Sequence, residues 1–175
     1  MSEAFSRPVV LDATVLSNFA STDSITWLTA TFDGLMTVPA VKNELRRGTE
    51  VGYEYLTSAL GAIESGKITI DETATEELEQ AYPKIRDQLD PGEAEALVTA
   101  DRIEGTLVTD DGTARQLASS REIELTGSIG LLVRGIAQEE LTVETADSWL
   151  ETWIDERSYY APVESVGDVL PDEYR

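Results

Sequence analysis

Short β-branched segments alternate with longer helical patterns along this chain, and this alternation limits the possible folds more than any other feature. Four apolar runs stand out: Pro8–Leu11, Leu35–Val38, Thr106–Thr109 and Ile123–Thr126. Strands that alternate with helices are typical of βαβ units, which build parallel sheets. We therefore predict an α/β fold with a central parallel sheet of four to five strands, in which Lys67–Ile70 is the candidate edge strand.

Helical patterns fill the intervals between these runs. Two of them cover about Glu50–Ile63 and Thr75–Leu89, and we expect Pro83 to kink or split the second. A third pattern begins at Asp90, which has the features of an N-cap because a proline follows it at the first helical position. The remaining predicted helices are Ala40–Arg47, Thr113–Ser119, Ile129–Ala137 and Val143–Glu156.

The chain contains no cysteine and no histidine. The absence of cysteine excludes disulfides, thiolate nucleophiles and cysteine-based metal sites. The absence of histidine excludes Ser-His-Asp and Cys-His pairs, HExxH zinc sites and a histidine general base. An enzyme with this composition must therefore rely on carboxylates, hydroxyls, a few Arg and Lys side chains and a hard metal ion.

Carboxylates fall where two of the predicted strands end. Asp12 ends the first run, and Asp110 and Asp111 follow the third. Ligands of open parallel sheets bind beyond the carboxyl ends of the strands. Two predicted helices add Glu44, at the border of an apolar face, and Glu93, in a first turn. A set of oxygen ligands without histidine or thiol suits Mg²⁺ or Mn²⁺ better than zinc.

Each of these acids also has a purely structural explanation. The alternatives are a helix cap for Asp12, a capping-box position for Glu93, a turn at Asp111-Gly112, and ion pairing of Glu44 with Lys42, Arg46 or Arg47. Four carboxylates that all fall near one edge of a sheet favour a common site over four unrelated structural roles.

These residues resemble the PIN domain, a family of divalent-metal-dependent ribonucleases that includes VapC-type toxins. Asp12 in Val-Val-Leu-Asp-Ala-Thr matches the opening motif, and Glu44 in Val-Pro-Ala-Val-Lys-Asn-Glu-Leu matches the second acid. Glu93 in Asp-Pro-Gly-Glu-Ala-Glu-Ala-Leu matches the third acid, and Asp111 in Leu-Val-Thr-Asp-Asp matches the fourth. The resemblance covers about residues 9–137 and includes an uncharacterised subgroup that is common in archaea and bacteria.

The resemblance implies a three-layer α/β/α fold and an endoribonuclease that hydrolyses RNA phosphodiester bonds with Mg²⁺ or Mn²⁺. The implied catalytic and metal-binding residues are Asp12, Glu44, Glu93 and Asp111, with Asp110 as an additional metal ligand. The implied substrate-binding residues are Thr14, Arg46, Thr109 and Arg115. The family's eighteen-residue step between the third and fourth acids selects Glu93 over Glu95 or Asp101. The implied partners are RNA, a small antitoxin-like protein and a second copy of the chain, because toxins of this family are held in pairs and often dimerise.

The net charge is −21, from 34 acidic and 13 basic residues. Such a surface is similar to that of proteins from extreme halophiles, because molar salt shortens the Debye length to about 3 Å and screens the self-repulsion. We expect a halophilic archaeal origin. We find no targeting signal and no apolar run near the ~20 residues of a membrane span, so we expect a cytoplasmic protein with no membrane contact. We expect one domain over residues 1–157, followed by an irregular tail over residues 158–175.

Other functions remain open at this point. A catalytically weak PIN-like module could bind nucleic acid or protein, with Tyr159, Tyr160 and Tyr174 of the tail at the interface or packed on the last helix. A metal-dependent hydrolase of a small phosphoester is a third hypothesis. Haloacid-dehalogenase phosphatases, receiver domains and P-loop proteins are disfavoured, because the chain lacks Asp-x-Asp at the first strand, a late lysine and a Gly-Lys-Ser/Thr turn.

Overall fold

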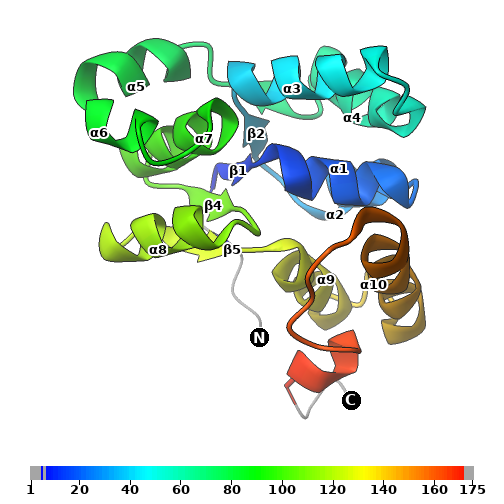
Figure 1. Cartoon of the computed structure of the whole chain (residues 1–175). Coiled ribbons are helices and arrows are strands. Elements are labelled where there is room, and N and C mark those ends of the chain that lie inside the picture. Colours follow the sequence, from blue (N-terminus) through cyan, green and yellow to red (C-terminus); the bar gives the residue numbers. More distant parts are fainter. Residues whose placement is uncertain (1–4, 6, 172–175) are drawn as a thin grey trace.

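A computed structural model describes residue 5 and residues 7–171 of the chain (Figure 1). Within these residues, five parallel strands form one sheet in the order β3-β2-β1-β4-β5. The strands are β1 (Val9–Leu11), β2 (Leu35–Thr37), β3 (Thr69–Ile70), β4 (Thr106–Val108) and β5 (Glu124–Thr126). Each predicted run contributes one strand, and the candidate edge strand is β3, so the predicted α/β class is confirmed.

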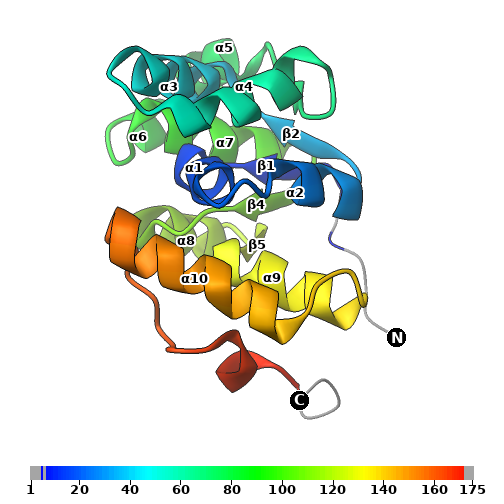
Figure 2. The ribbon, with the colours of Figure 1, turned by 90° about the vertical axis from the view of Figure 1, so that its right-hand side faces the viewer.

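Helices cover both faces of the sheet, which gives the three layers that the resemblance implies (Figure 1). One face carries α5 (Ala74–Ala81), α6 (Pro83–Arg86), α7 (Pro91–Arg102) and α8 (Gly112–Ser120). The other carries α1 (Ala13–Ser21), α2 (Ile25–Thr31), α9 (Ser128–Ala137) and α10 (Val143–Arg157). Figure 2 looks onto this second face, where α3 (Pro39–Glu50) and α4 (Thr57–Glu64) lie beyond α1.

The central strands β1 and β4 are buried along their whole length, because helices cover them from both sides. Helix α7 packs directly on both strands. The turn into β4 is tight: a Cβ atom at Gly105 would lie 2.2 Å from the carbonyl oxygen of Pro8, so no side chain fits there. The positions of Asp12 and of the acids after β4 are therefore fixed by a rigid, closely packed pair of strands.

One predicted helix is wrong and a second divides as predicted, both for identifiable reasons. Helix α3 continues to Glu50, and the chain then breaks at Gly52, which has a φ of 110°. A short 3-10 turn (η1, Glu54–Leu56) follows before α4 begins, so Glu50–Ile63 is not one helix. The pattern over Thr75–Leu89 divides into α5 and α6 at Pro83, as its ring requires.

The segment after α10 returns along the molecule. Ser158 ends α10 in the left-handed conformation, with a φ of 55°. A second 3-10 turn (η2, Val166–Val169) follows, and Val166 and Leu170 are buried in the core. Residues 172–175, which belong to the predicted tail and include Tyr174, lie outside the described residues.

Among the helices of the described residues, none combines the length and the apolar character that crossing a bilayer demands.

Candidate functional site

The candidate site lies where the strand order of the sheet reverses. From β1 the chain builds outward through β2 to β3, and it then returns to β4 on the other side of β1. Ligands of open parallel sheets bind at such a reversal, beyond the carboxyl ends of the strands. Asp12 directly follows β1, and Asp110 and Asp111 follow β4 one residue later. The fold therefore brings these acids, which are about a hundred residues apart, to one edge of the sheet.

Asp12 is the most buried acid of the site, with 3% of its surface exposed. It is the N-cap of α1: its Oδ1 accepts a hydrogen bond from the backbone N–H of Ala13 at 2.7 Å. Its Oδ2 accepts one from the Thr109 hydroxyl at 2.8 Å. Burial raises the pKa of Asp12 to about 7; the two hydrogen bonds oppose this rise, and the charges of Asp90 and Glu44 add to it.

Glu93 and Glu44 approach Asp12 from two different helices. Glu93 lies half-buried in the first turn of α7, and burial together with the charges of Asp90, Asp12 and Asp111 raises its pKa. Glu44 lies on α3 with an exposed side chain, and partial burial of its carboxyl group and the charge of Asp90 raise its pKa. These mutual effects show that the predicted acids share one electrostatic environment.

Asp90 is a fifth acid of this environment, although its sequence pattern predicts only a capping role. That role is real, because its Oδ1 accepts a hydrogen bond from the backbone N–H of Glu93 at 2.9 Å. Asp90 also raises the pKa values of Asp12, Glu44 and Glu93. The two roles coincide because the N-terminus of α7 lies at the same edge of the sheet as the end of β1, which the capping pattern alone does not reveal.

Asp111 and Thr109 link the end of β4 to Asp12. Asp111 is the N-cap of α8, and its Oδ2 accepts a hydrogen bond from the backbone N–H of Ala114 at 2.8 Å. The backbone N–H of Asp111 donates to the Thr109 hydroxyl oxygen at 3.2 Å, while that hydroxyl donates to Asp12. The capping explanation of Asp12 and Asp111 is therefore correct, and it does not prevent both residues from lining one site.

Asp110 has a different environment from Asp111. Its carboxylate accepts hydrogen bonds from the backbone N–H and the hydroxyl of Ser128 at 2.8 and 2.5 Å, and longer ones of 3.4 Å from Asn18 and Tyr159. A Cβ atom at Gly127 would lie 2.6 Å from Asp110 Oδ1, so glycine is needed beside it. These contacts tie Asp110 to α1, α9 and the segment after α10, and they leave Asp111 as the acid that is more open to a ligand.

The predicted substrate-binding residues differ in how they relate to the site. Arg115 lies on α8, and its Nη1 donates to the carbonyl oxygen of Thr109 at 2.9 Å, which holds the guanidinium group beside the site. Thr14 is exposed on α1 and lines a cavity of about 300 Å³. Arg46 is exposed on α3 and does not line that cavity. The residues that line it are Thr14, Asn18, Glu93, Asp110, Asp111, Arg157, Ser158, Tyr159 and Tyr160.

The two acids that the family spacing set aside have structural contacts. Glu95 is buried, and its two oxygens accept hydrogen bonds from the backbone N–H of Ala40 at 3.0 Å and from the Thr75 hydroxyl at 2.9 Å. Asp101 accepts a hydrogen bond from the Tyr82 hydroxyl at 3.1 Å and pairs with Arg121 at 3.5 Å. Glu95 therefore fastens the beginning of α3, the helix that carries Glu44, to α7.

The chemical types of these residues suit a divalent cation, but the spacing of the carboxylates limits how one can bind. The donors are carboxylates and a threonine hydroxyl, which are ligands that Mg²⁺ and Mn²⁺ prefer. Burial and mutual repulsion disfavour their charged forms, and a cation between them would reverse that effect. In the part of the chain that the structure describes, no group of three or more acids is spaced as a ligand shell. Binding a cation therefore requires the carboxylates to draw together.

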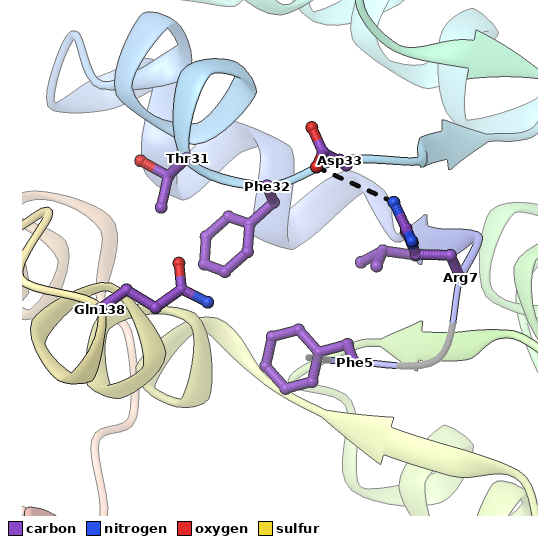
Figure 3. A pocket seen from close by; sticks show the side chains of 7 residues that line it. Phe5, Arg7, Thr31, Phe32, Asp33 and Gln138 are labelled. Atoms are coloured by element: carbon purple, nitrogen blue, oxygen red, sulfur yellow. Dashed lines mark ion pairs between the residues drawn. The ribbon is translucent and has the colours of Figure 1, made fainter. Parts of the chain in front are cut away.

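A different cavity, of about 240 Å³, lies at the opposite end of β1 (Figure 3). The rings of Phe5 and Phe32 lie 5.9 Å apart there, and Arg7 pairs with Asp33 at 3.8 Å on the exposed rim. The predicted acids do not line this cavity. It is thus separate from the acidic edge of the sheet.

Comparison with known proteins agrees with the three-layer α/β/α fold described above. A family model described as a PIN domain matches residues 8–171, which is most of the chain. No curated protein matches the sequence.

Proposed function

The chain belongs to the PIN domain family, whose members are generally nucleases, and from this premise we propose that it is a divalent-metal-dependent endoribonuclease. The observation that carries the proposal is the environment of Asp12. This carboxylate is buried at the switch point of the sheet, its pKa is raised to about 7, and the charges that act on it are those of other acids. A perturbed acid of this kind in a cleft is typical of a functional site.

In this proposal Asp12, Glu44, Glu93 and Asp111 hold Mg²⁺ or Mn²⁺, and Asp90 adds negative charge. A bound divalent cation would lower the pKa of a water molecule and offset the charge that develops on the phosphodiester. The Thr109 hydroxyl orients Asp12 through its 2.8 Å hydrogen bond.

The proposed role of Arg115 is to bind a phosphate of the substrate. Its Nη1 is held by the Thr109 carbonyl oxygen, and this contact fixes the planar guanidinium group beside Gly127 and Asp110. A guanidinium group has five donors in a fixed fork, so its remaining N–H groups can contact phosphate oxygens.

The charge of the chain indicates the conditions under which it would act. A net charge of −21 repels RNA in dilute buffer, and molar salt screens that repulsion together with the attraction of Arg115 and Arg46 for phosphate. We propose that the protein acts in the salt-rich cytoplasm of a halophile. Affinity then depends on metal bridges and on contacts that do not depend on charge.

The resemblance to VapC-type toxins supports a finer proposal, in which the protein is the toxin of a toxin–antitoxin pair. It would then form a homodimer, and a small antitoxin-like protein would block the acidic site until it is degraded.

One observation favours a second candidate function, that of a catalytically weak interaction module. In the described residues the acids are not spaced as a complete ligand shell. Acids that could not draw together would still form a negatively charged surface that contacts a partner. Metal binding and metal-dependent RNA cleavage together separate the two candidates.

The experiment is a titration with Mn²⁺ and Mg²⁺ in about 2 M KCl, in which thermal unfolding of the wild type is compared with that of Asp12→Asn/Asp111→Asn. A cation that binds only the native state stabilises it by about 2.7 kcal/mol at a hundred-fold excess over Kd. Asp71→Asn is a matched control, because Asp71 also follows a strand of this sheet and is not one of the acids of the candidate site. The quantity to compare is the metal-induced shift of each variant.

We expect a metal-dependent rise in stability in the wild type and in Asp71→Asn, and none in the double variant. Cleavage of RNA should fall at least about a hundred-fold in the double variant, because several kcal/mol of transition-state stabilisation depend on the cation. If wild type and double variant respond equally to metal, the site assignment is wrong. If metal binds and RNA stays intact, the interaction module is the better description.

A further inference from the structure

The segment that follows α10 forms one wall of the cavity that Glu93, Asp110 and Asp111 line, which we call the acidic cavity. Arg157, Ser158, Tyr159 and Tyr160 line this cavity opposite Glu93, Asp110 and Asp111. Tyr160 has 90% of its surface exposed, which is unusual for a tyrosine at the rim of a polar site.

A second groove, of about 570 Å³, begins where the acidic cavity ends. The two share Tyr159 and Tyr160, so the groove adjoins the candidate site at these two residues. Its other lining residues are Ile154, Ala161, Pro162, Val163, Glu164 and Asp168, and most of them are apolar. Ile154 of α10 is 36% exposed and lines this groove.

Specific contacts of Arg157 and Tyr159 hold the wall in place. The ring of Tyr159 lies 5.8 Å from the ring of Trp153, and its hydroxyl contacts Asp110 at 3.4 Å. Arg157 donates from Nε to Asn18 Oδ1 at 2.8 Å and from Nη1 to the Tyr55 hydroxyl at 2.6 Å. Tyr160 therefore directly follows a segment that is attached to α1 and to Asp110.

The chemistry of the two adjoining cavities favours a nucleotide over a protein segment as the ligand. Arg157 lines the acidic cavity and offers donors to a phosphate, and Arg115 lies beside it without lining either cavity. Tyr160 and the mostly apolar groove offer a flat ring and an apolar surface to a base. Stacking of a base on an aromatic ring does not depend on charge and contributes at high salt, where phosphate attraction is weak. Because the chain has a net charge of −21 and repels RNA, a stacking contact is a source of affinity that does not depend on charge.

We infer that Tyr160 and the groove beyond it form a base-binding subsite, in which an unpaired base of the RNA stacks on the Tyr160 ring while the adjacent phosphate lies at the acids. This inference rests on the proposed function, because the phosphate is placed at the same acidic site. It makes Tyr160 a substrate-binding residue and assigns a role to the segment after α10.

The test measures binding without cleavage. Fluorescence anisotropy in about 2 M KCl, with saturating Ca²⁺ in place of Mg²⁺ and Mn²⁺, gives the affinity for a short single-stranded RNA and for an abasic strand of the same length and charge. The variants are Tyr160→Ala, Tyr160→Leu and Tyr160→Phe. Tyr53→Ala is the matched control, since Tyr53 is also an exposed tyrosine, at 55%, and lines neither cavity.

We expect Tyr160→Ala and Tyr160→Leu to weaken binding of the intact RNA by about 5-fold to 150-fold, as the loss of one stacked base predicts. Tyr160→Phe and Tyr53→Ala should bind within about two-fold of the wild type. The abasic strand should bind the wild type and Tyr160→Ala equally. Equal affinity of the wild type for intact and abasic strands, or no binding of either at millimolar RNA, overturns the inference.

The same variants separate this inference from the proposed function. If base-dependent binding requires Tyr160 and no metal supports cleavage, the subsite stands and the nuclease proposal fails. If the wild type cleaves RNA and Tyr160→Ala cleaves and binds it equally well, the nuclease proposal stands and the subsite fails. Sedimentation of Tyr160→Ala tests the competing role: loss of a dimer with unchanged RNA affinity assigns the ring to a protein interface and overturns the inference.

Discussion

Two buried carboxylates of this protein each directly follow a strand of the sheet, one central and one at the edge, and they have opposite environments. Asp12 follows β1, Asp71 follows β3, and the backbone N–H of each continues the hydrogen bonding to the neighbouring strand. They are 3% and 9% exposed. Each accepts a hydrogen bond of 2.8 Å from a buried threonine hydroxyl, Thr109 for Asp12 and Thr99 for Asp71.

The neighbouring charges distinguish the two residues. Asp71 pairs with Arg102. Burial raises its pKa, but the hydrogen bonds from Thr73, Thr99 and Arg102 outweigh that effect and hold the pKa below its usual value. Asp12 has Asp90 and Glu44 as its charged neighbours, and its pKa rises to about 7.

The comparison teaches that burial by itself does not decide the role of a carboxylate in this fold. Asp71 is stabilised as an anion by its own chain and acts as a structural link between β3 and α7. Asp12 is left among like charges, an arrangement that costs stability and that a bound cation would relieve. Such unrelieved electrostatic cost is typical of functional sites.

The largest effect that this comparison predicts is a change of stability with opposite sign for two isosteric substitutions. Asp71→Asn removes the charge that pairs with Arg102, so we expect the free energy of unfolding to fall by about 2 kcal/mol. Asp12→Asn removes a charge that is buried among acids, so we expect a rise of roughly 1 to 3 kcal/mol at pH 8 in EDTA. Denaturant unfolding in about 2 M KCl measures both changes.

The controls remove one hydrogen-bond donor from each carboxylate. Thr99→Val and Thr109→Val should each lower the free energy of unfolding by about 1 kcal/mol, because each leaves a buried carboxylate with one fewer hydrogen bond. If Asp12→Asn lowered stability as much as Asp71→Asn does, Asp12 would be a structural carboxylate and the contrast between the two sites would not exist.

The sequence predicts one part of this contrast well. A β-branched run that ends in an acid places that acid at the carboxyl edge of a parallel sheet, and this local rule located Asp12 and Asp111 correctly. The edge strand β3 was also predicted, and the proline at position 83 separates α5 from α6 as expected. These features depend on short segments whose conformation their own residues determine.

Other parts depend on contacts between distant segments, which one sequence does not reveal. Asp90 satisfies a capping pattern so fully that nothing local indicates its effect on Asp12. The hydrogen bond between Asn18 and Arg157 joins residues 139 positions apart. The place of Tyr160 beside the acids follows from that long-range attachment, and the tail pattern alone predicts only an irregular segment.

A smaller effect is expected from pH. Between its unfolded value of 3.8 and its folded value of about 7, Asp12 binds a proton in the folded state and releases it on unfolding. The free energy of unfolding therefore falls as pH rises through this range, by up to about 1.4 kcal/mol per pH unit for one proton. The raised pKa values of Glu44 and Glu93 act in the same direction. Asp71 acts oppositely, because its stabilising effect is complete above its unfolded pKa and is lost only in stronger acid.

Unfolding curves at pH 5, 6, 7 and 8 in EDTA measure this slope. Asp12→Asn should flatten it by nearly one proton's contribution, whereas Asp71→Asn should leave it unchanged over this range. Parallel curves for the wild type and Asp12→Asn would contradict the raised pKa. Saturating Mn²⁺ should flatten the wild-type slope as well, because a cation holds the carboxylates in their charged form.

The smallest predicted effect concerns Glu95, a third buried carboxylate whose donors are neutral. Its oxygens accept from Ala40 N–H and the Thr75 hydroxyl, so its environment lies between those of Asp71 and Asp12. Glu95→Gln keeps an acceptor for Ala40 and weakens the favourable charge at the N-terminus of α3, so we expect a loss of about 1 kcal/mol by denaturant unfolding. The three isosteric substitutions would then rank by the charge of their partners: a clear loss at Asp71, a small loss at Glu95 and a gain at Asp12. A loss at Glu95 as large as that at Asp71 would show that the number of hydrogen bonds, and not the charge of the donor, decides how well this fold tolerates a buried acid.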